Sequence, residues 1–235
     1  MPYVSVVKQG GSKFIVKINR NLDEQKILEY LHSREQQSNH IIRPVGICTS
    51  NLGPGIVLPF CQSIEWLMVD SKRTKPKGPK GRLGRFRCFA EDLISGLQFL
   101  HSHLVAHCDI KPGNLVYLPG FGLQIIDFDV AVKLDKDTDI VNDIVGTQGY
   151  MAPELNKNRR LPYNPLKADL WSCGRVIEGF FGRMNVEEPF KELKQFVSEL
   201  MAYNPRKRPP LHSWKWSTSM PAQKWARVKD NMVEM

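Results

Sequence analysis

The sequence lacks several features that mark secreted and membrane-spanning proteins. No apolar run approaches the roughly 18 residues that a membrane-spanning helix needs. The first eleven residues do not show a charged segment followed by an apolar one, which is the pattern of a secretory signal. The five cysteines are scattered and never arranged as CxxC, so they favour neither a disulfide framework nor a structural zinc site. These absences predict a reduced, intracellular protein, cytoplasmic or nuclear, with no membrane span.

Acidic residues are the scarcer charges, since 24 Asp and Glu stand against 33 Lys and Arg, for a formal net charge of +9. The chain has 235 residues, of which 42% are hydrophobic and 24% charged. This length can bury a core, and the composition is neither that of a disordered chain nor that of a fibre. The sequence, which contains no internal repeat, therefore suits one globular domain or a small two-lobed one.

The basic excess is concentrated in residues 71–87, which contain no acidic residue. Together with the glycines and prolines there, this composition predicts a solvent-exposed loop over 71–85. Its competing uses are docking of acidic proteins, nuclear import, or binding of nucleic acid or an anionic membrane. Nucleic acid is the weakest of these, because the only nearby aromatic residues, Phe86 and Phe89, fit better in a following helix. The basic residues are Lys72, Arg73, Lys75, Lys77, Lys80, Arg82, Arg85 and Arg87.

Before this segment the pattern is mainly that of β-strands. Two β-rich runs flank the segment Gln9–Ser12, whose paired glycines are typical of a hairpin turn. A short helix follows, with Asn21 as its candidate N-cap. The predicted elements are strands at 4–7 and 13–18, a helix at 22–32, and strands at 41–49 and 55–60.

After the basic segment the pattern is mainly helical. Phe89, Leu93, Leu97 and Leu100 repeat at helical spacing, so this helix should face the core. Strands and helices do not alternate as βαβ units, so the predicted fold class is α+β, with a small β lobe followed by a larger α lobe. The predicted elements are helices at 87–101, 168–181 and 187–202, and short strands at 115–118 and 123–127.

Five segments carry recognisable motifs in a fixed order. They read HCDIKPGN at 107–114, DFD at 127–129, GTQGYMAPE at 146–154, DLWSCG at 169–174 and NPRKRP at 204–209. In this order and spacing they resemble the landmarks of the eukaryotic protein kinase family. Cys108 replaces Arg in the HRDxKxxN motif, and Asp129 replaces Gly in DFG. The runs VAHCDIKPGNLVY and LQIIDFDVAV are similar to those of divergent Ser/Thr kinase-like proteins of higher fungi.

The resemblance covers nearly the whole chain, from about Val4 to Pro210, and it implies a bilobal protein kinase-like fold. The N-terminal lobe would comprise residues 1–60 and the C-terminal lobe residues 61–235. Within the second lobe, the resemblance implies a basic loop at 71–87 and an activation segment at 127–154.

The resemblance also implies a catalytic set of four residues. Phosphoryl transfer depends on neutralising dispersed negative charge and on in-line positioning, which polar and charged side chains provide. Asp109 would accept or orient the proton of the substrate hydroxyl, and Lys111 would sit beside the γ-phosphate. Asn114 and Asp127 would bind Mg²⁺, for which their hard oxygen atoms are suited. The Asp-x-Lys order resembles Ser/Thr kinases more than Tyr kinases.

Nucleotide-binding residues are implied nearer the amino terminus. Lys17, at the end of the run FIVK, resembles the strand lysine that grips the α- and β-phosphates of ATP, and Glu24 is its expected partner. If Asn21 caps the helix, Glu24 could instead satisfy backbone donors there, leaving Glu29 or no residue for the lysine. The hinge that binds adenine through its backbone would consist of Pro59, Phe60 and Cys61, preceded by the gatekeeper Leu58.

Three further residues, Glu154, Arg208 and Asp169, are implied to support the site without touching substrate. Glu154 and Arg208 resemble the buried structural ion pair of the family. Asp169 resembles the residue that braces the backbone of the catalytic loop. Thr147 resembles the residue that contacts the catalytic aspartate and lysine.

The chain departs from the family pattern on the nucleotide side. Only sixteen residues precede Lys17, so the family's first strand and its Gly-rich phosphate loop have no counterpart. Gly10 and Gly11 lie too near that lysine to form the loop and are typical of a turn. Ile15 replaces the small residue that faces adenine. Asp129 adds a carboxylate that would either repel the phosphates or supply another metal ligand.

Further departures concern regulation and substrate docking. Cys108 removes an arginine that, in many relatives, pairs with a phosphorylated residue, and Asp143 occupies the position that is often phosphorylated. Control by phosphorylation of the activation segment is therefore not expected, with Thr138 as the remaining candidate. Between helices ending near Gly182 and beginning near Glu187, there is no room for the helix that commonly docks protein substrates.

The sequence therefore predicts Mg²⁺-dependent transfer of the γ-phosphate of ATP to Ser or Thr hydroxyls of proteins. The alternative is a catalytically weak or inactive kinase-like scaffold, which the missing phosphate loop favours. A third hypothesis is binding of nucleic acid or of an acidic partner by the basic loop. The expected partners are ATP and a protein that is a substrate or a binding partner.

Overall fold

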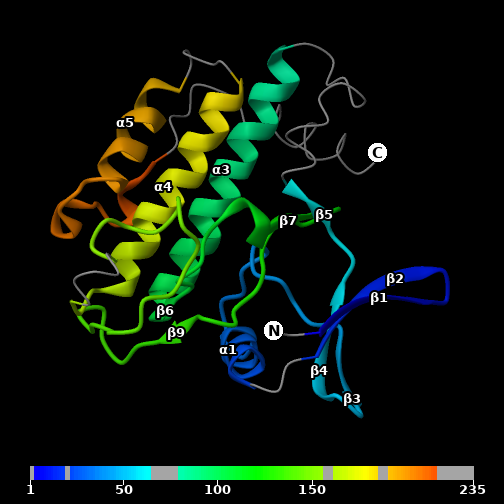
Figure 1. Ribbon diagram of the computed structural model, residues 1–235. Helices are drawn as coiled ribbons and strands as arrows, with labels where there is room; N and C mark the ends of the chain where they lie inside the picture. Colours follow the sequence, from blue (N-terminus) through cyan, green and yellow to red (C-terminus); the bar gives the residue numbers. More distant parts are fainter. Residues whose placement is uncertain (1–2, 19–21, 65–78, 156–160, 185–189, 216–235) are drawn as a thin grey trace.

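A computed structural model describes residues 3–18, 22–64, 79–155, 161–184 and 190–215 of the chain. A β-rich part at the amino-terminal end is followed by a larger, mainly helical part (Figure 1). The predicted α+β, bilobal architecture is therefore confirmed. Within the described residues, no helix has both the length and the apolar character needed to span a membrane.

Four antiparallel strands form the amino-terminal sheet, in the order β1-β2-β4-β3. The central strands β2 (Ser12–Ile18) and β4 (Gly53–Pro59) contribute its buried side chains, while β1 (Tyr3–Gln9) and β3 (Gly46–Ser50) are the edges. Helix α1 (Asp23–His32) follows β2 and buries a single apolar face. That face consists of Ile27, Leu28 and Leu31.

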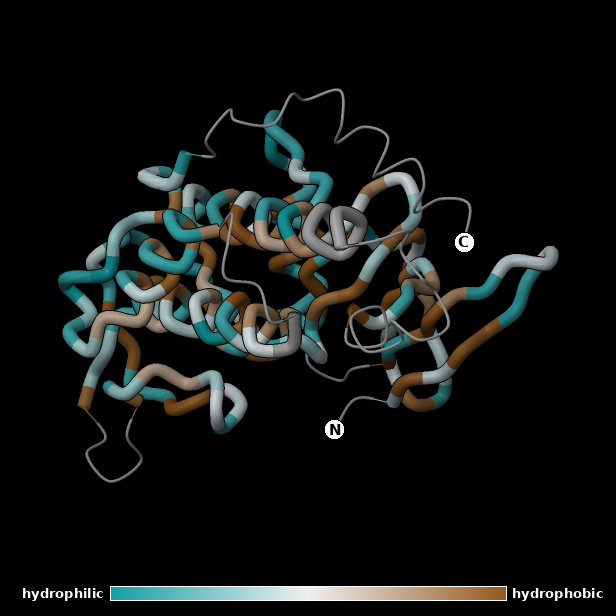
Figure 2. The backbone as a smooth tube through the Cα atoms, turned by 90° about the horizontal axis from the view of Figure 1, so that it is seen from above, coloured by the Kyte–Doolittle hydropathy of each residue, from teal (hydrophilic) through white to brown (hydrophobic). Residues whose placement is uncertain are grey.

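The β1–β2 hairpin projects away from the rest of the chain (Figures 1 and 2). Gln9 pairs with Ser12, so the turn has only two central residues, Gly10 and Gly11. Their φ angles are +58° and +82°, in the left-handed region that glycine enters without a steric penalty. The predicted hairpin turn is confirmed, and these glycines are turn residues.

We expect Gly11→Ala to lower the free energy of unfolding by about 1–2 kcal/mol, because a Cβ disfavours the left-handed backbone. Gly179→Ala is the matched control, since Gly179 lies in helix α4 (Pro165–Met184) with open space where its Cβ would be. That change should stabilise the protein by about 0.5–1 kcal/mol. Urea unfolding measures both. Equal effects of the two substitutions would contradict the turn geometry.

Two long helices, α3 (Pro79–Ser102) and α4, lie side by side in the helical part, and α5 (Lys191–Leu200) packs on α4 (Figure 1). The antiparallel strands β7 (Leu115–Leu118) and β8 (Gly122–Ile125) adjoin α3. The shorter elements are β5 (Gln62–Ser63), β6 (Val105–Ala106), β9 (Val132–Lys133), and the 3₁₀ helices η1 (Pro112–Asn114), η2 (Pro205–Lys207) and η3 (Leu211–Ser213).

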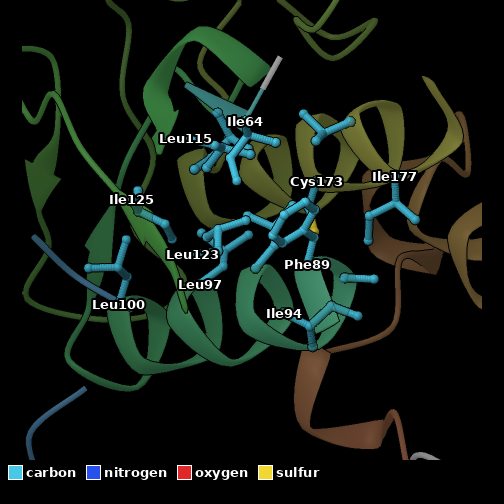
Figure 3. Close-up of a cluster of buried hydrophobic side chains, with 14 of the residues drawn as sticks. Ile64, Phe89, Ile94, Leu97, Leu100, Leu115, Leu123, Ile125, Cys173 and Ile177 are labelled. Carbon is cyan, nitrogen blue, oxygen red and sulfur yellow. The ribbon is translucent and has the colours of Figure 1, made fainter. Parts of the chain in front are cut away.

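The main core lies where α3, α4 and the β7–β8 pair meet (Figure 3). The predicted apolar face of α3 is confirmed, because all four of its periodic residues are buried. In Figure 3, Phe89 and Leu97 of α3 gather with Cys173 of α4 and Leu123 of β8 in one cluster. This core fixes the loops that leave β6 and β8, and these loops carry the candidate site.

The prediction of a loop over residues 71–85 is wrong for residues 79–85. Helix α3 begins at Pro79, not near residue 87, so residues 79–85 are helical. Proline at the first helical position is favourable, and Lys and Arg have good helix propensity, which outweighs the two glycines there. The basic residues before Pro79, namely Lys72, Arg73, Lys75 and Lys77, lie outside the described residues.

Other boundaries also differ from the prediction. β3 begins at Gly46, not at Ile41, because Ile42 donates its backbone N–H to Ile125 and Pro44 has none to donate. The N-cap position of α1 is Leu22, which makes no side-chain cap, and Asn21 lies outside the described residues. The predicted capping role of Asn21 therefore does not define the start of this helix.

Candidate active site

The loop at 107–114 is held by Asp169 of α4, which is only 1% exposed. Its carboxylate accepts hydrogen bonds from the backbone N–H groups of His107 (2.7 Å) and Cys108 (2.9 Å). His101 Nε2 lies 3.1 Å from the same carboxylate. Cys108 has a φ angle of +65°, which is uncommon for a residue with a side chain. Asp169 thus braces the loop in a conformation that would otherwise be unfavourable.

His107 is buried and links this loop to the end of β8. Its Nδ1 accepts a hydrogen bond from the backbone N–H of Asp109 (3.2 Å), so its Nε2 donates to the carbonyl oxygen of Ile126 (3.0 Å). Its ring centroid lies 5.0 Å from that of Phe128. These contacts give His107 a packing role, as its motif indicates.

Asp109, Lys111 and Thr147 form a closed hydrogen-bonded set. Lys111 Nζ donates to Asp109 Oδ2 (2.7 Å) and to Thr147 Oγ1 (2.8 Å). Thr147 Oγ1 donates to Asp109 Oδ1 (2.8 Å). The carboxylate and the ammonium group are therefore oriented before any substrate arrives.

Asn114 also contacts Asp109. Its Nδ2 donates to the carbonyl oxygen of Asp109 (2.9 Å) and to its Oδ2 (3.2 Å). Because the amide nitrogen is used in this way, Oδ1 is the Asn114 side-chain atom that could coordinate a cation. The Asn114 carbonyl oxygen also accepts from Ile126 N–H (3.0 Å), which places Asn114 beside the segment that leads to Asp127.

The DFD segment connects the helical part to helix α1. Asp127 has a φ angle of +69°, and the Phe128 side chain is fully buried. The backbone N–H of Phe128 donates to Glu24 Oε1 (3.0 Å), a contact that the sequence did not predict. One glutamate on α1 therefore fixes the backbone of this segment.

Lys17 on β2 meets three carboxylates. Its Nζ lies 2.8 Å from Glu24 Oε2, 2.5 Å from Asp127 Oδ1 and 3.1 Å from Asp129 Oδ1. Glu29, the alternative partner, is exposed and instead accepts a hydrogen bond from Gln25. The lysine therefore pairs with Glu24 and not with Glu29.

Burial alone would lower the pKa of Lys17, but the carboxylates of Glu24 and Asp127 more than reverse this and raise it above its ordinary value. The side chain is accordingly a fixed positive charge at any physiological pH. Its positive charge suits an anionic ligand, which would compete with these carboxylates for its N–H groups.

The carboxylate oxygens near Lys17 are suitable ligands for a hard divalent cation. Carboxylate oxygens of Glu24, Asp127 and Asp129 lie within 4.8 Å of one another. Mg²⁺ prefers oxygen ligands such as the carboxylate oxygens of Asp127 and the side-chain Oδ1 of Asn114. Asp127 and Asn114 are thus chemically suited to the metal that the resemblance implies.

The predicted hinge follows directly from the strand that pairs with β2. Leu58 is buried and lies opposite Ile15, and Pro59 lies opposite Phe14. Phe14 precedes Lys17 by three residues, or about 10 Å of extended strand. The backbone after Leu58 therefore lies beside the start of β2, whereas Lys17 lies near its end. This separation suits a ligand with an aromatic group at one end and an anionic group at the other.

The two remaining hinge residues have different surroundings. Phe60 is exposed, and the Lys13 ammonium lies 5.2 Å from its ring centroid. Cys61 donates its Sγ–H to the Pro59 carbonyl oxygen (3.5 Å). Burial raises the pKa of Cys61 to about 11, so its thiol is neutral at physiological pH.

Glu154 and Arg208 form the predicted ion pair. Arg208 Nη1 and Nη2 donate to Glu154 Oε1 (2.6 Å) and Oε2 (2.7 Å) in a two-pronged contact. Arg208 also donates to the carbonyl oxygens of Ala202 (2.9 Å) and Lys167 (2.8 Å). Its side chain is completely inaccessible, so the pair ties the segment at 146–154 to η2.

Segment 127–154 is fastened by residues that the sequence analysis missed. Val141 and Tyr163 exchange backbone hydrogen bonds, and the Tyr163 hydroxyl donates to the Asp143 carbonyl oxygen (2.9 Å). Asn164 Nδ2 donates to the carbonyl oxygens of Asp137 (2.6 Å) and Asp139 (3.2 Å). No motif marks these two residues, because they act through backbone atoms of a distant segment.

Cys108 provides no positive charge that could pair with a residue of segment 127–154. Burial, together with the Asp169 and Asp109 carboxylates, raises the pKa of its thiol well above the ordinary value. A neutral thiol cannot pair with a phosphorylated side chain. The contacts of Tyr163 and Asn164 hold the segment without any modification.

The sequence of this chain matches a known protein family and several known proteins. A sequence model of the protein kinase domain family matches residues 5–191. The chain is 31% identical over 199 residues to a protein of Vanderwaltozyma polyspora named "Probable serine/threonine-protein kinase HAL5-like", and the match covers 80% of this chain and 25% of that protein.

Two further relatives have similar names. A Zea mays protein, "Probable serine/threonine-protein kinase CCRP1", is 28% identical over 221 residues, covering 83% of this chain and 32% of its own. A Saccharomyces cerevisiae protein, "Probable serine/threonine-protein kinase KKQ8", is 36% identical over 169 residues, covering 70% of this chain and 23% of its own. The chain thus spans less than a third of the length of these relatives.

Proposed function

Because this chain belongs to the protein kinase family, we propose that it transfers the γ-phosphate of ATP to Ser or Thr hydroxyls of proteins in the presence of Mg²⁺. The observation that carries this proposal is the closed set of Asp109, Lys111 and Thr147 beside Asn114. A carboxylate, an ammonium group and an amide in this arrangement suit a reaction that depends on orientation and charge neutralisation. The names of the yeast and maize relatives support the choice of Ser and Thr.

In this proposal Asp109 accepts or orients the proton of the attacking hydroxyl. Lys111 lies 2.7 Å from the Asp109 carboxylate and provides positive charge where the phosphate is transferred. Thr147 donates to the same carboxylate and keeps it turned toward the hydroxyl. Asn114 donates to this carboxylate as well. A base that is already held by three donors loses little orientational entropy when the substrate binds.

Lys17 would hold the α- and β-phosphates, with Glu24 fixing its position. Asn114 and Asp127 would hold Mg²⁺, which neutralises phosphate charge when it is bound. The adenine would meet the backbone at Pro59, Phe60 and Cys61 after the gatekeeper Leu58. The strand distance from this hinge to Lys17 supports a nucleotide that lies along β2.

The division of the chain belongs to the same proposal. Residues 1–60 would be the N-terminal lobe and residues 61–235 the C-terminal lobe, with the activation segment at 127–154. The free state of all five cysteines supports a reducing, intracellular location. Binding of acidic partners or nucleic acid by the basic segment 71–87 remains a hypothesis, since residues 71–78 lie outside the described residues.

The proposal is tested by incubating the purified chain with γ-labelled ATP, Mg²⁺ or Mn²⁺ and casein or myelin basic protein. Acid hydrolysis of the labelled product should yield phosphoserine and phosphothreonine. Asp109→Asn serves as the control for contaminating kinases. Label confined to phosphotyrosine would refute the proposed hydroxyl class. A chain that binds nucleotide but transfers no label would instead be the inactive scaffold.

A further inference from the structure

The contacts of the Lys17 ammonium group bear on how a nucleotide enters this site. An ammonium group has three N–H donors. Three carboxylate oxygens lie within 3.1 Å of Lys17 Nζ, one each from Glu24, Asp127 and Asp129. Each donor thus has a protein carboxylate as its potential acceptor, and a phosphate oxygen must displace one of them.

The three carboxylates differ in how firmly they are held. Glu24 is 4% exposed and its second oxygen accepts from the Phe128 backbone N–H, so it is anchored at both oxygens. Asp127 is 37% exposed, but it has the shortest contact with Lys17, at 2.5 Å. Asp129 has the longest, at 3.1 Å, and its side chain is 25% exposed. By distance, the Asp129 contact is therefore the weakest of the three, and a phosphate oxygen would displace it most readily.

We propose that Asp129 competes with the nucleotide phosphates for Lys17 and so weakens nucleotide binding in this chain. This inference rests on the proposed function, because it assumes that Lys17 is the phosphate-binding residue. The Asp129 carboxylate takes a donor that a phosphate oxygen would use and also places a negative charge beside the phosphates. Both effects act in the same direction, and both are lost when the carboxylate is removed. Asp129 thus affects the nucleotide through Lys17 and not through a contact of its own with the reacting atoms.

Two substitutions separate the charge of Asp129 from its size. Asp129→Asn keeps the side chain's size and removes its charge, whereas Asp129→Gly removes the side chain. Each should tighten the binding of metal-free ADP by about tenfold, since a partly exposed charge within contact distance has an effect of this order. Asp135→Asn is the matched control, because Asp135 is exposed on the same segment and should leave the affinity unchanged.

Isothermal titration of the full chain with ADP, without and with Mg²⁺, provides the test, and the KM for ATP measured beside kcat gives a second readout. Competition for Lys17 predicts a lower KM in both variants. Unchanged ADP affinity in both variants would overturn the inference. Weaker binding of Mg²⁺–ADP in Asp129→Asn would also overturn it, because Asp129 would then be a metal ligand.

The same measurements separate this inference from the proposed function. If the variants bind ADP more tightly but no form transfers phosphate, the competition stands and the proposed activity fails. If wild type transfers phosphate but the affinities are equal, the activity stands and the competition fails. If no form binds ADP at millimolar concentration, both are refuted.

Discussion

Asp109→Asn should lower the rate of phosphate transfer by about a hundredfold to ten-thousandfold, the range that removal of a general base typically produces. Asp109 accepts hydrogen bonds from Thr147 and Lys111 through different oxygens, at 2.8 and 2.7 Å. An amide in its place turns an NH₂ group toward one of these donors. It also cannot accept the proton of a substrate hydroxyl. The effect should appear in kcat more than in KM, since the nucleotide contacts at Lys17 are separate.

The matched control is Asp135→Asn, the same chemical change at an exposed position of the same segment. Its transfer rate should equal that of wild type. Differential scanning calorimetry should show an unchanged melting temperature for Asp135→Asn. It should show a modest fall for Asp109→Asn, which loses an acceptor for one of these donors, with both variants folded at the assay temperature. An Asp109→Asn variant with undiminished kcat would show that this carboxylate is not the base.

Glu154→Ala should lower the free energy of unfolding by about 3–5 kcal/mol, because it leaves a buried charge without a partner. The Arg208 side chain is completely inaccessible to solvent, and both of its terminal nitrogens donate to Glu154. Its other contacts are to the carbonyl oxygens of Ala202 and Lys167 and to the Trp171 ring, whose centroid lies 5.2 Å from Arg208 Cζ. None of these groups carries a negative charge that would balance the guanidinium. For a protein of this size the loss corresponds to a fall in melting temperature of roughly 6–20 °C.

Glu178→Ala provides the matched control for this prediction. Glu178 pairs with Arg175 on α4, but the two side chains are 47% and 41% exposed. An exposed pair contributes about 0–1 kcal/mol, so this variant should melt close to wild type. If the two glutamate variants lost the same stability, burial would not be what makes the Glu154–Arg208 pair important.

Much of the site could be predicted because its residues are close in sequence and chemically distinctive. The spacing of Asp109, Lys111 and Asn114 within one short loop is itself the signal, and these side chains lie within hydrogen-bonding distance in the structure. Gly10 and Gly11 gave an equally local signal, since a two-residue hairpin turn requires left-handed backbone. The mechanistic roles of the loop residues remain predictions.

Other features depend on contacts between distant segments, which periodicity and motifs do not report. The Glu24 contact with the Phe128 backbone joins residues 104 positions apart, so no local pattern announces it. The same is true of the Tyr163 contact with the Asp143 carbonyl oxygen. The early start of α3 was missed because the glycines and prolines near residue 79 favour a loop, although Pro79 stands at the first helical position, where proline is favourable. Sequence reasoning could name Asp129 as unusual but could not place it against Lys17.

The most direct test of this account is a time course of γ-phosphate transfer from Mg²⁺–ATP to a protein substrate, comparing wild type with Asp127→Asn. Asp127 is proposed to hold Mg²⁺ and lies 2.5 Å from Lys17, so its carboxylate charge is needed at the centre of the site. The account predicts Ser and Thr labelling by wild type and a rate at least about a hundredfold lower in the variant. Equal labelling by the two proteins, or no labelling by wild type at millimolar Mg²⁺–ATP, would contradict it.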